Sequence, residues 1–263
     1  MRRESKPVLG QHWLPHGPSL AAMAAAAELS PGEVVLEIGT GPGYLTDELL
    51  KTGAAVVSLE YDRSVFDKAR LKYGAQPPPN LRLLQGDIRR FDWPALGPSF
   101  KICANIPYYL SANLLRQLTE LADKPALAAL LLPEAVADKL TAVAKRSLLA
   151  ALVQLHYAVE AGPLIPKEMF SPPPKIDSKI IVLRHRPAFS NLEPDAWPRL
   201  VGLLKAAFAA PRKQLIVNLG RNLELPRAEL ETALGTAGVR PRQRAEELSN
   251  DQWLALLRAL PPA

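Results

Sequence analysis

The sequence is poor in the residues that form covalent cross-links and metal centres. Its 263 residues include one cysteine, Cys103, and four widely spaced histidines. A single cysteine excludes an internal disulfide and suits a reducing compartment, so we expect a cytoplasmic protein. Because these few ligands show none of the usual metal-ligand spacings, we expect no bound metal. Cys103 itself is interpreted as a small buried strand residue and not as a nucleophile.

Long apolar runs are also missing, and the charge is only mildly unbalanced. No stretch reaches the roughly 18 consecutive apolar residues that suggest a membrane span, and the charged start is not followed by an apolar signal segment. The formal net charge is +6, shared about equally between residues 1–185 and 186–263. An excess of this size favours an anionic partner without requiring one. A hydrophobic fraction of 48% predicts a substantial core.

The first half of the chain alternates regularly between strand-like and helix-like segments. Short apolar runs followed by helix-like stretches predict a parallel, doubly wound, Rossmann-like α/β sheet. Ligands of such sheets bind at the carboxyl ends of the strands. The expected strands cover residues 34–38, 55–59, 81–84, 100–104 and 126–132, and the expected helices cover residues 19–29, 44–52, 63–73 and 111–121.

The pattern changes after about residue 187. Helix-like stretches at residues 197–209, 227–237 and 250–260 follow one another with no strand between them. We therefore expect an α/β domain over residues 1–187, followed by a small, all-helical C-terminal domain over residues 188–263. The boundary is placed in the segment from Pro187 to Pro194.

A glycine-rich loop and two acidic residues indicate a nucleoside site. The first strand runs into Gly39-Thr40-Gly41-Pro42-Gly43, where glycines let backbone amides approach a ligand closely. This is not the GxGxxG of dinucleotide folds, and it lacks the lysine of a phosphate loop. Glu60, at the end of the second strand, is placed to grip a ribose diol. Asp87, after the third, is placed to accept a hydrogen bond from an adenine amine. An acidic residue at the position of Glu60 is shared by NAD sites and S-adenosylmethionine sites, so it does not distinguish these two cofactors.

The most specific motif, Asn105-Ile106-Pro107-Tyr108, ends the fourth strand. Amino-directed methyltransferases carry this kind of motif at this place. The amine of adenine is a poor nucleophile because its lone pair is delocalised into the ring. Hydrogen bonds to an asparagine oxygen and a neighbouring backbone oxygen let the nitrogen pyramidalise and aim its lone pair at a methyl donor. Proline stiffens the loop, and the tyrosine ring offers a face on which the base stacks.

Together these motifs resemble the ribosomal RNA adenine dimethyltransferase family. The family includes small-subunit dimethyladenosine transferases of the kasugamycin-sensitivity type, resistance methylases that act on large-subunit rRNA, and mitochondrial transcription factor B proteins. The resemblance covers most of the chain. Beyond the loop, the two acids and the Asn105 motif, it rests on Lys6, Gly10-Gln11-His12-Trp13-Leu14, Phe170-Ser171-Pro172-Pro173-Pro174-Lys175-Ile176-Asp177-Ser178, Ala207-Phe208, Arg212-Lys213 and the segment from Arg244 to Ser249.

The resemblance implies S-adenosylmethionine as the cofactor and assigns roles to individual residues. Phe170 is expected to face the other side of the target base from Tyr108, and the N-terminal segment to close over the cofactor. The expected catalytic residues are Asn105, Ile106, Pro107, Tyr108 and Phe170. The expected cofactor-binding residues are His12, Leu14, Gly39, Gly41, Glu60, Asp87 and Asn105, and the expected RNA-binding residues are Lys175, Arg212 and Lys213.

The function implied is dimethylation of two adjacent adenines near the 3′ end of small-subunit rRNA during ribosome biogenesis. The expected partner is that rRNA or a pre-ribosomal subunit, and the enzyme is expected to act as a monomer. Two alternatives stay open: a large-subunit rRNA methylase of the resistance type, and a non-catalytic assembly or transcription factor on the same fold. The helical tail and the full Pro-rich loop favour the small-subunit substrate, and the intact motifs argue against lost catalysis.

Overall fold

The computed structural model describes residues 11–186 and 196–261, and within them the chain forms two compact units. The first, here called the sheet unit, comprises the chain up to Asp138 together with Tyr157–His185. The second, the helical unit, comprises Lys139–His156 and the chain from Arg186 onward. The chain therefore leaves the sheet unit at Lys139, returns to it at Tyr157 to complete the sheet, and leaves it again at Arg186.

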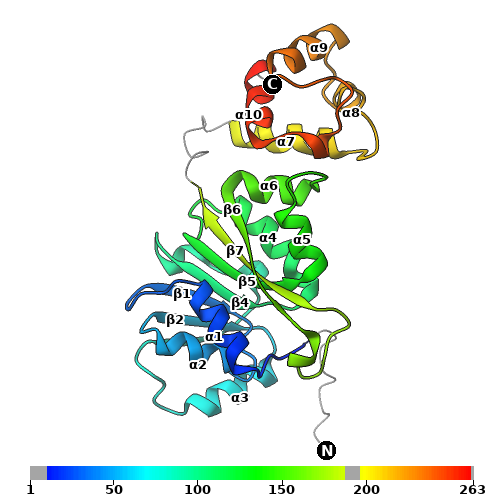
Figure 1. The fold of residues 1–263 in the computed structure, drawn as a ribbon. Helices are drawn as coiled ribbons and strands as arrows, with labels where there is room; N and C mark the ends of the chain where they lie inside the picture. Colours follow the sequence, from blue (N-terminus) through cyan, green and yellow to red (C-terminus); the bar gives the residue numbers. More distant parts are fainter. Residues whose placement is uncertain (1–10, 187–195, 262–263) are drawn as a thin grey trace, which may run out of the picture. The chain divides into compact units, whose positions relative to one another are not determined.

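The sheet unit contains one seven-stranded sheet in the order β3-β2-β1-β4-β5-β7-β6 (Figure 1). Strands β1 to β5 are parallel to their neighbours among these five, and β7 is antiparallel to both β5 and β6. The predicted Rossmann-like α/β sheet is confirmed. The strands are β1 (Val34–Ile38), β2 (Ala55–Glu60), β3 (Leu81–Gln85), β4 (Lys101–Asn105), β5 (Leu127–Pro133), β6 (Tyr157–Ile165) and β7 (Ser178–His185).

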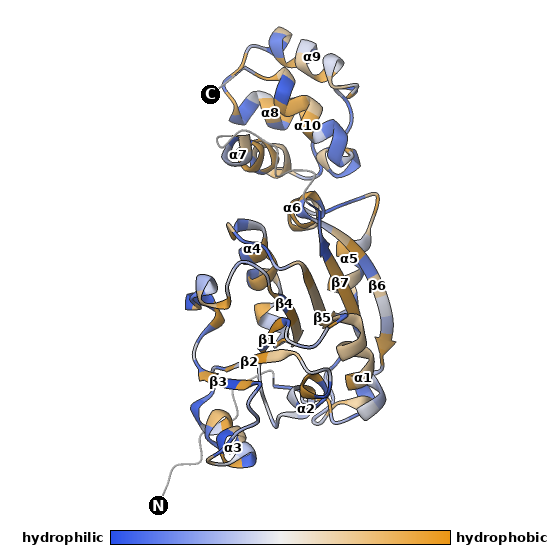
Figure 2. Cartoon of the chain, turned by 90° about the vertical axis from the view of Figure 1, so that its left-hand side faces the viewer, coloured by the Kyte–Doolittle hydropathy of each residue, from blue (hydrophilic) through white to orange (hydrophobic). Residues whose placement is uncertain are grey.

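Helices cover both faces of this sheet, with α1 in front of it and α4 behind it in the view of Figure 1. Because both faces are covered, most positions of the central strands are apolar. All seven positions of β5 are buried, and Figure 2 shows β4, β5 and β7 dominated by hydrophobic residues. The helices are α1 (Gly17–Ala26), α2 (Tyr44–Lys51), α3 (Arg63–Tyr73), α4 (Ser111–Glu120) and α5 (Glu134–Thr141), within which the chain leaves the sheet unit.

Two strands of the sheet, β6 and β7, were not predicted, and β7 runs antiparallel to both of its neighbours, β5 and β6. β6 contains Gly162-Pro163 and a register shift between Ala161 and Leu164, so its sequence lacks a clear strand periodicity. β7 pairs with β5 along the whole length of β5, from Ser178 opposite Pro133 to Arg184 opposite Leu127. The short helices α5, α6 and α8 were also missed.

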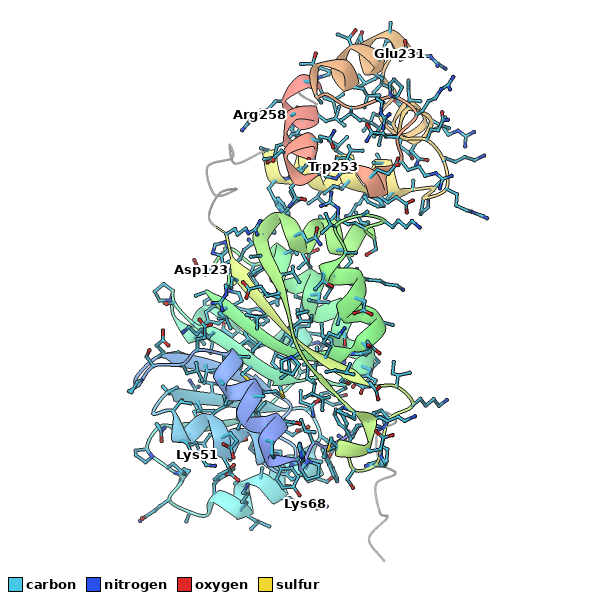
Figure 3. The ribbon with its side chains drawn as sticks, viewed as in Figure 1. Lys51, Lys68, Asp123, Glu231, Trp253 and Arg258 are labelled. Atoms are coloured by element: carbon cyan, nitrogen blue, oxygen red, sulfur yellow. The ribbon has the colours of Figure 1, made fainter. Side chains whose placement is uncertain are left out.

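The helical unit consists of α6 (Leu148–His156), α7 (Ala196–Phe208), α8 (Leu215–Asn222), α9 (Arg227–Thr236) and α10 (Asn250–Ala259). Trp253 lies at its centre, fully buried, with its ring centroid 6.1 Å from that of Phe208 (Figure 3). Ser249 caps α10 by accepting a hydrogen bond from the amide of Gln252. The three C-terminal helices expected from the sequence are all present.

Helix α6 precedes β6 in the chain, yet its Ala151, Leu152 and Leu155 belong to the apolar core of the helical unit. The boundary expected between Pro187 and Pro194 falls outside the described residues, so a domain division at that point stays a prediction.

Within residues 11–186 and 196–261, no helix has the length and apolarity needed to cross a bilayer.

Candidate active site

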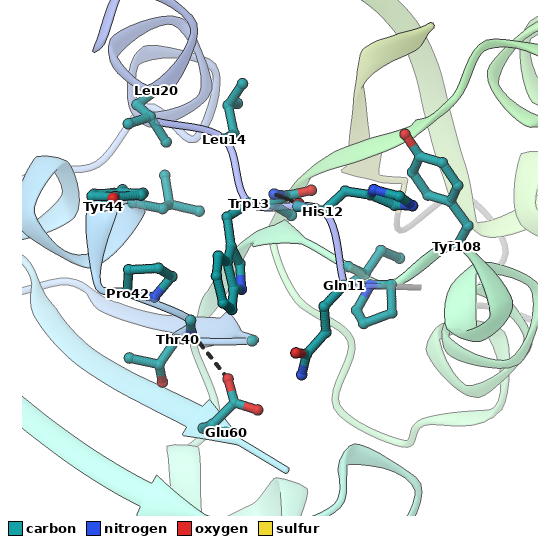
Figure 4. A pocket seen from close by; sticks show the side chains of 16 residues that line it. Gln11, His12, Trp13, Leu14, Leu20, Thr40, Pro42, Tyr44, Glu60 and Tyr108 are labelled. Atoms are coloured by element: carbon teal, nitrogen blue, oxygen red, sulfur yellow. Dashed lines mark hydrogen bonds between the residues drawn. The ribbon is translucent and has the colours of Figure 1, made fainter. Parts of the chain in front are cut away.

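The candidate site lies where the parallel strands end. In-register pairing places Ile38 beside Leu59 and Glu60 beside Gln85, so these strands finish at one edge of the sheet. A pocket of about 660 Å³ opens there between the glycine loop, the end of β4 and the segment from Gln11 to Leu14 (Figure 4). An adjoining pocket of about 560 Å³ is lined by residues that include Glu60, Tyr61, Asp87, Arg89 and Tyr109.

The glycine loop between β1 and α2 has the conformation for which its glycines are needed. Gly39, Gly41 and Gly43 all have positive φ, at 87°, 54° and 78°. A Cβ on Gly41 would lie 3.3 Å from Cδ1 of Trp13, so the indole packs directly on the loop backbone. The loop is therefore shaped both by its own dihedrals and by the N-terminal segment that covers it.

Glu60 is held by the backbone around it. One carboxylate oxygen accepts a hydrogen bond from the amide of Gly41 at 3.0 Å, and the other accepts one from the amide of Asp62 at 2.9 Å. The side chain is buried, and this burial raises its pKa, while the two backbone hydrogen bonds act in the opposite direction. Each oxygen keeps lone-pair capacity for a further donor such as a ribose hydroxyl.

Asp87 has a different partner. The guanidinium of Arg89 contacts both of its oxygens, with Nη2 2.5 Å from Oδ2, and the amide of Arg89 donates to Oδ1 at 3.0 Å. The hydrogen bonds from the Arg89 side chain lower the pKa of Asp87. The carboxylate is thereby kept ionised at the wall of the smaller pocket.

A buried hydroxyl network supports the glycine loop from beneath. Glu37 on β1 is fully buried, and one of its oxygens accepts hydrogen bonds from the hydroxyls of Thr46 and Ser58, both at 2.6 Å. Because Ser58 uses its proton on Glu37, Thr40 of the glycine loop donates to Ser58, also across 2.6 Å. The other oxygen of Glu37 has no partner among the described residues. Sequence analysis did not identify this network.

The Asn105 motif follows β4 directly. The side-chain nitrogen of Asn105 donates to the carbonyl of His12 at 3.3 Å, which turns its oxygen away from that contact. Ile106 is buried beneath the loop, and Pro107 has an extended conformation, with φ of −54° and ψ of 132°. Tyr108 is half-buried, and its hydroxyl lies 2.7 Å from that of Ser178. Asn105 and Tyr108 both line the larger pocket.

The N-terminal segment links the larger pocket to the Pro-rich loop. Trp13 and Ser171 exchange two backbone hydrogen bonds, at 3.2 and 2.8 Å, and Nδ1 of His12 lies 2.8 Å from the carbonyl oxygen of Pro172. The imidazole of His12 also stands beside the ring of Tyr108, with centroids 5.7 Å apart. His12 and Leu14 both line the larger pocket. The family-like Lys6 and Gly10 fall outside the described residues.

Phe170 lies apart from the other catalytic candidates. Its ring is 3% exposed and belongs to the apolar cluster that contains Leu14, Ile165 and Ile180, and it lines neither pocket. The structure thus gives Tyr108 no stacking partner from Phe170, and a base held between the two rings stays a prediction that requires Phe170 to leave the core.

The basic candidates are all on the surface. Lys175 is exposed in the loop before β7 of the sheet unit, and Arg212 and Lys213 are exposed between α7 and α8 of the helical unit.

Among the residues that the structure describes, no cluster of three or more histidine, cysteine, aspartate or glutamate side chains is placed to hold a metal ion.

The fold and the pockets at the ends of its parallel strands define a Rossmann-like methyltransferase. Within that class, residues 2–260 match the family described as ribosomal RNA adenine dimethylase. The chain belongs to this family.

The similarity to individual relatives extends over nearly the whole chain. It is 38% identical to the ribosomal RNA small subunit methyltransferase A of Thermosynechococcus vestitus, over 95% of each chain. The protein of the same name from Synechococcus elongatus is 37% identical, over 94% of this chain and 92% of the relative. Among solved structures, the 23S rRNA methyltransferase ErmE is 28% identical with a TM-score of 0.77, covering 94% of this chain and 99% of its own. A dimethyladenosine transferase from Plasmodium falciparum has the same fold, with a TM-score of 0.80 at 24% identity, over 93% and 96% of the two chains.

The buried Glu37 yields a test of the network under the glycine loop. Burial raises the pKa of this carboxyl to about 8, so the folded state retains its proton at pH values where the unfolded chain has lost it. Stability from this group is fully present below the unfolded pKa and is lost as the pH rises toward about 8. Glu37→Gln removes the titration and keeps an oxygen that can accept both hydroxyls.

We therefore expect the melting temperature of Glu37→Gln, relative to that of the wild type, to increase as the pH rises from about 5 to about 8. Thermal melts across this range provide the measurement. Glu33→Gln serves as the control, because Glu33 lies just before β1, where it is partly exposed and pairs with Lys101. Parallel curves for wild type and Glu37→Gln would show that Glu37 does not titrate in this window.

Proposed function

We propose that this protein transfers methyl groups from S-adenosylmethionine to N6 of two adjacent adenines near the 3′ end of small-subunit rRNA, in ribosome biogenesis in the cytoplasm. The observation that carries the proposal is the Asn105 motif at the end of β4, opening on a pocket built from a glycine loop and Glu60. The relatives named for the small-subunit reaction, at 37 and 38% identity, support the choice of substrate.

A large-subunit substrate is the second candidate, because the structure of a 23S rRNA methyltransferase covers 94% of the chain. Its identity of 28% is lower than that of the small-subunit relatives, which favours the small-subunit substrate. The non-catalytic alternative finds no support in the site, where the glycine loop, Glu60, Asp87 and the Asn105 motif are all in place.

The residues present fit S-adenosylmethionine. In the proposed arrangement Glu60 accepts hydrogen bonds from the ribose hydroxyls and Asp87 accepts one from the adenine amine. The amides of the glycine loop and the segment from His12 to Leu14 line the remaining pocket. When bound, S-adenosylmethionine supplies an electrophilic methyl group on a positively charged sulfur.

The chain's own contribution to the reaction is to orient the target amine. The side-chain oxygen of Asn105, together with a backbone oxygen of the same loop, accepts the two amine hydrogens and draws the lone pair out of conjugation. Tyr108 provides the face on which the extruded base stacks. No side chain with a shifted pKa is required to remove a proton, because the methylated amine is strongly acidic before it loses one.

Contact with the rRNA is proposed to involve both units. Lys175 on the sheet unit and Arg212 and Lys213 on the helical unit are exposed cations that can contact phosphates. A folded pre-ribosomal subunit presents phosphates over a wide surface, which suits such dispersed contacts. We propose that the protein acts on this partner as a monomer.

Asn105→Ala should lower the single-turnover rate of methyl transfer by at least about a hundredfold, by analogy with the loss of one oxyanion-stabilising donor. Its affinity for the cofactor should change much less. The assay follows labelled methyl groups from S-adenosylmethionine into undermethylated small subunits. Asn80→Ala is the matched control. The side-chain amide of Asn80 also donates to a carbonyl, that of Ala54, but both residues lie at the amino ends of β2 and β3, away from the site. Transfer by Asn105→Ala at the wild-type rate would refute the mechanism, and no transfer by the wild type to any rRNA would leave the binding-factor alternative.

Glu60→Ala should bind S-adenosylmethionine about tenfold more weakly or worse, because a hydrogen bond to a charged group contributes about 1.5–3 kcal/mol. Isothermal titration calorimetry measures the change directly. Glu33→Ala controls for the loss of a carboxylate elsewhere on the same unit. Unchanged affinity in Glu60→Ala, or tighter binding of NAD than of S-adenosylmethionine by the wild type, would contradict the assigned cofactor site.

Affinity for the undermethylated small subunit should fall steeply with salt, because cations on the protein displace counterions from phosphates. Replacing Lys175, Arg212 or Lys213 by alanine should lower the slope of log K against log salt by roughly 0.7–0.9 for each phosphate that is no longer neutralised. Lys51→Ala, an exposed lysine paired with Glu48 on α2, should leave the slope unchanged. Filter binding over a series of salt concentrations tests this, and a flat response of the wild type would rule out the electrostatic contacts.

A further inference from the structure

The end of the Pro-rich loop places one small polar side chain against the catalytic motif. Ser178 is the first residue of β7, and it is paired on one side with Pro133 of β5 and on the other with Ile165 of β6. Strand pairing on both sides leaves its backbone little freedom, and the residue is fully buried. Its hydroxyl is therefore a fixed point within the sheet.

That hydroxyl lies 2.7 Å from the hydroxyl of Tyr108, 70 residues earlier in the chain. Figure 4 shows the tyrosine with its ring beside His12 and its hydroxyl directed away from the centre of the pocket. The other end of the side chain is fixed by the short 3₁₀ turn Tyr108–Leu110, which follows Pro107. The ring is thus held at both ends, by the turn at its Cα and by Ser178 at its oxygen.

We propose that Ser178 is a positioning residue for methyl transfer, which fixes the ring plane of Tyr108 on which the target adenine stacks. The inference rests on the proposed function, since it concerns the same base pocket. A side chain such as Tyr has two rotatable torsions, and a hydrogen bond at its far end removes most of the remaining ring motion. Because stacking sets the tilt of the base, the ring plane also sets the direction in which the amine meets Asn105 and the methyl donor.

A purely structural hydrogen bond predicts a different outcome from a positioning one. A structural bond lowers the melting temperature and weakens every step that needs the folded site. A positioning bond acts on the orientation of the bound base, so it lowers the rate of the chemical step. Binding of the subunit through phosphates and binding of the cofactor through Glu60 should be little affected.

The experiment compares Ser178→Ala, Tyr108→Phe and the double variant in single-turnover methyl transfer to undermethylated small subunits. Each single variant should reduce the maximal rate about threefold to tenfold, the effect of one neutral hydrogen bond. The double variant should be no slower than the slower single variant, because both changes remove the same bond. The subunit concentration at half-maximal rate and the calorimetric affinity for S-adenosylmethionine should stay within about twofold of the wild type, well below the effect of removing a hydrogen bond to either ligand.

Two further variants separate positioning from folding. Ser178→Thr keeps the hydroxyl and should restore most of the rate. Tyr157→Phe removes the hydroxyl of a buried tyrosine that donates to the carbonyl of Leu118 in the same unit, and it should lower the melting temperature while the rate is unchanged. If Ser178→Ala fails to fold, Tyr108→Phe still removes the bond from the half-buried side of the contact.

A wild-type rate in Ser178→Ala or Tyr108→Phe, or a double variant whose loss is the product of the two single losses, would overturn the proposal. Absence of methyl transfer by the wild type is a separate result, because it contradicts the proposed function before any variant is compared.

Discussion

The parallel register of the first strands is the constraint on which the site depends. Ile38, Leu59 and Leu84 lie side by side in β1, β2 and β3, so the residues that follow them emerge at one edge. A register shift of one residue in β2 would turn Glu60 to the other face of the sheet. The register is held by burial on both faces, which makes the hydrophobic core, and not the polar site itself, responsible for the spacing between the glycine loop and Glu60.

The acidic residues around this edge lie in three electrostatic environments, and each suits a different task. Glu37 is fully enclosed, and burial raises its pKa, so it supports the loop as a hydrogen-bond acceptor without bringing a charge to the pocket. Glu60 is buried but faces two backbone amides, which keep its oxygens oriented toward the pocket. Asp87 lies beside Arg89, which lowers its pKa. Of the three carboxyl groups, those of Glu60 and Asp87 line the pockets, whereas that of Glu37 lies beneath the glycine loop.

Features encoded locally could be predicted from the sequence, and those formed by distant segments could not. The glycine loop, the acids at the ends of β2 and β3, and the Asn105 motif are each short and follow a recognisable strand. The bond between Tyr108 and Ser178 joins residues 70 apart, and nothing in either segment indicates the other as its partner. The burial of Phe170 was also beyond reach of the sequence, since an aromatic ring at this place serves a core and a stacking surface equally well. β6 was missed because Gly162-Pro163 interrupts its alternation of polar and apolar residues.

The detour of the chain through residues 139–156 has a consequence for the order of events during synthesis. When β5 leaves the ribosome, the side of it that will pair with β7 has no strand beside it, and the chain next produces α5 and then α6, which belongs to the other unit. β7 arrives more than forty residues after β5, because it begins at Ser178 and β5 ends at Pro133. Until then, the hydroxyl of Tyr108 lacks its hydrogen-bond partner, the hydroxyl of Ser178. In the order of synthesis, the strands that lead into the glycine loop, Glu60 and Asp87 therefore come first, and Ser178, the partner of the Tyr108 hydroxyl, comes only after the detour.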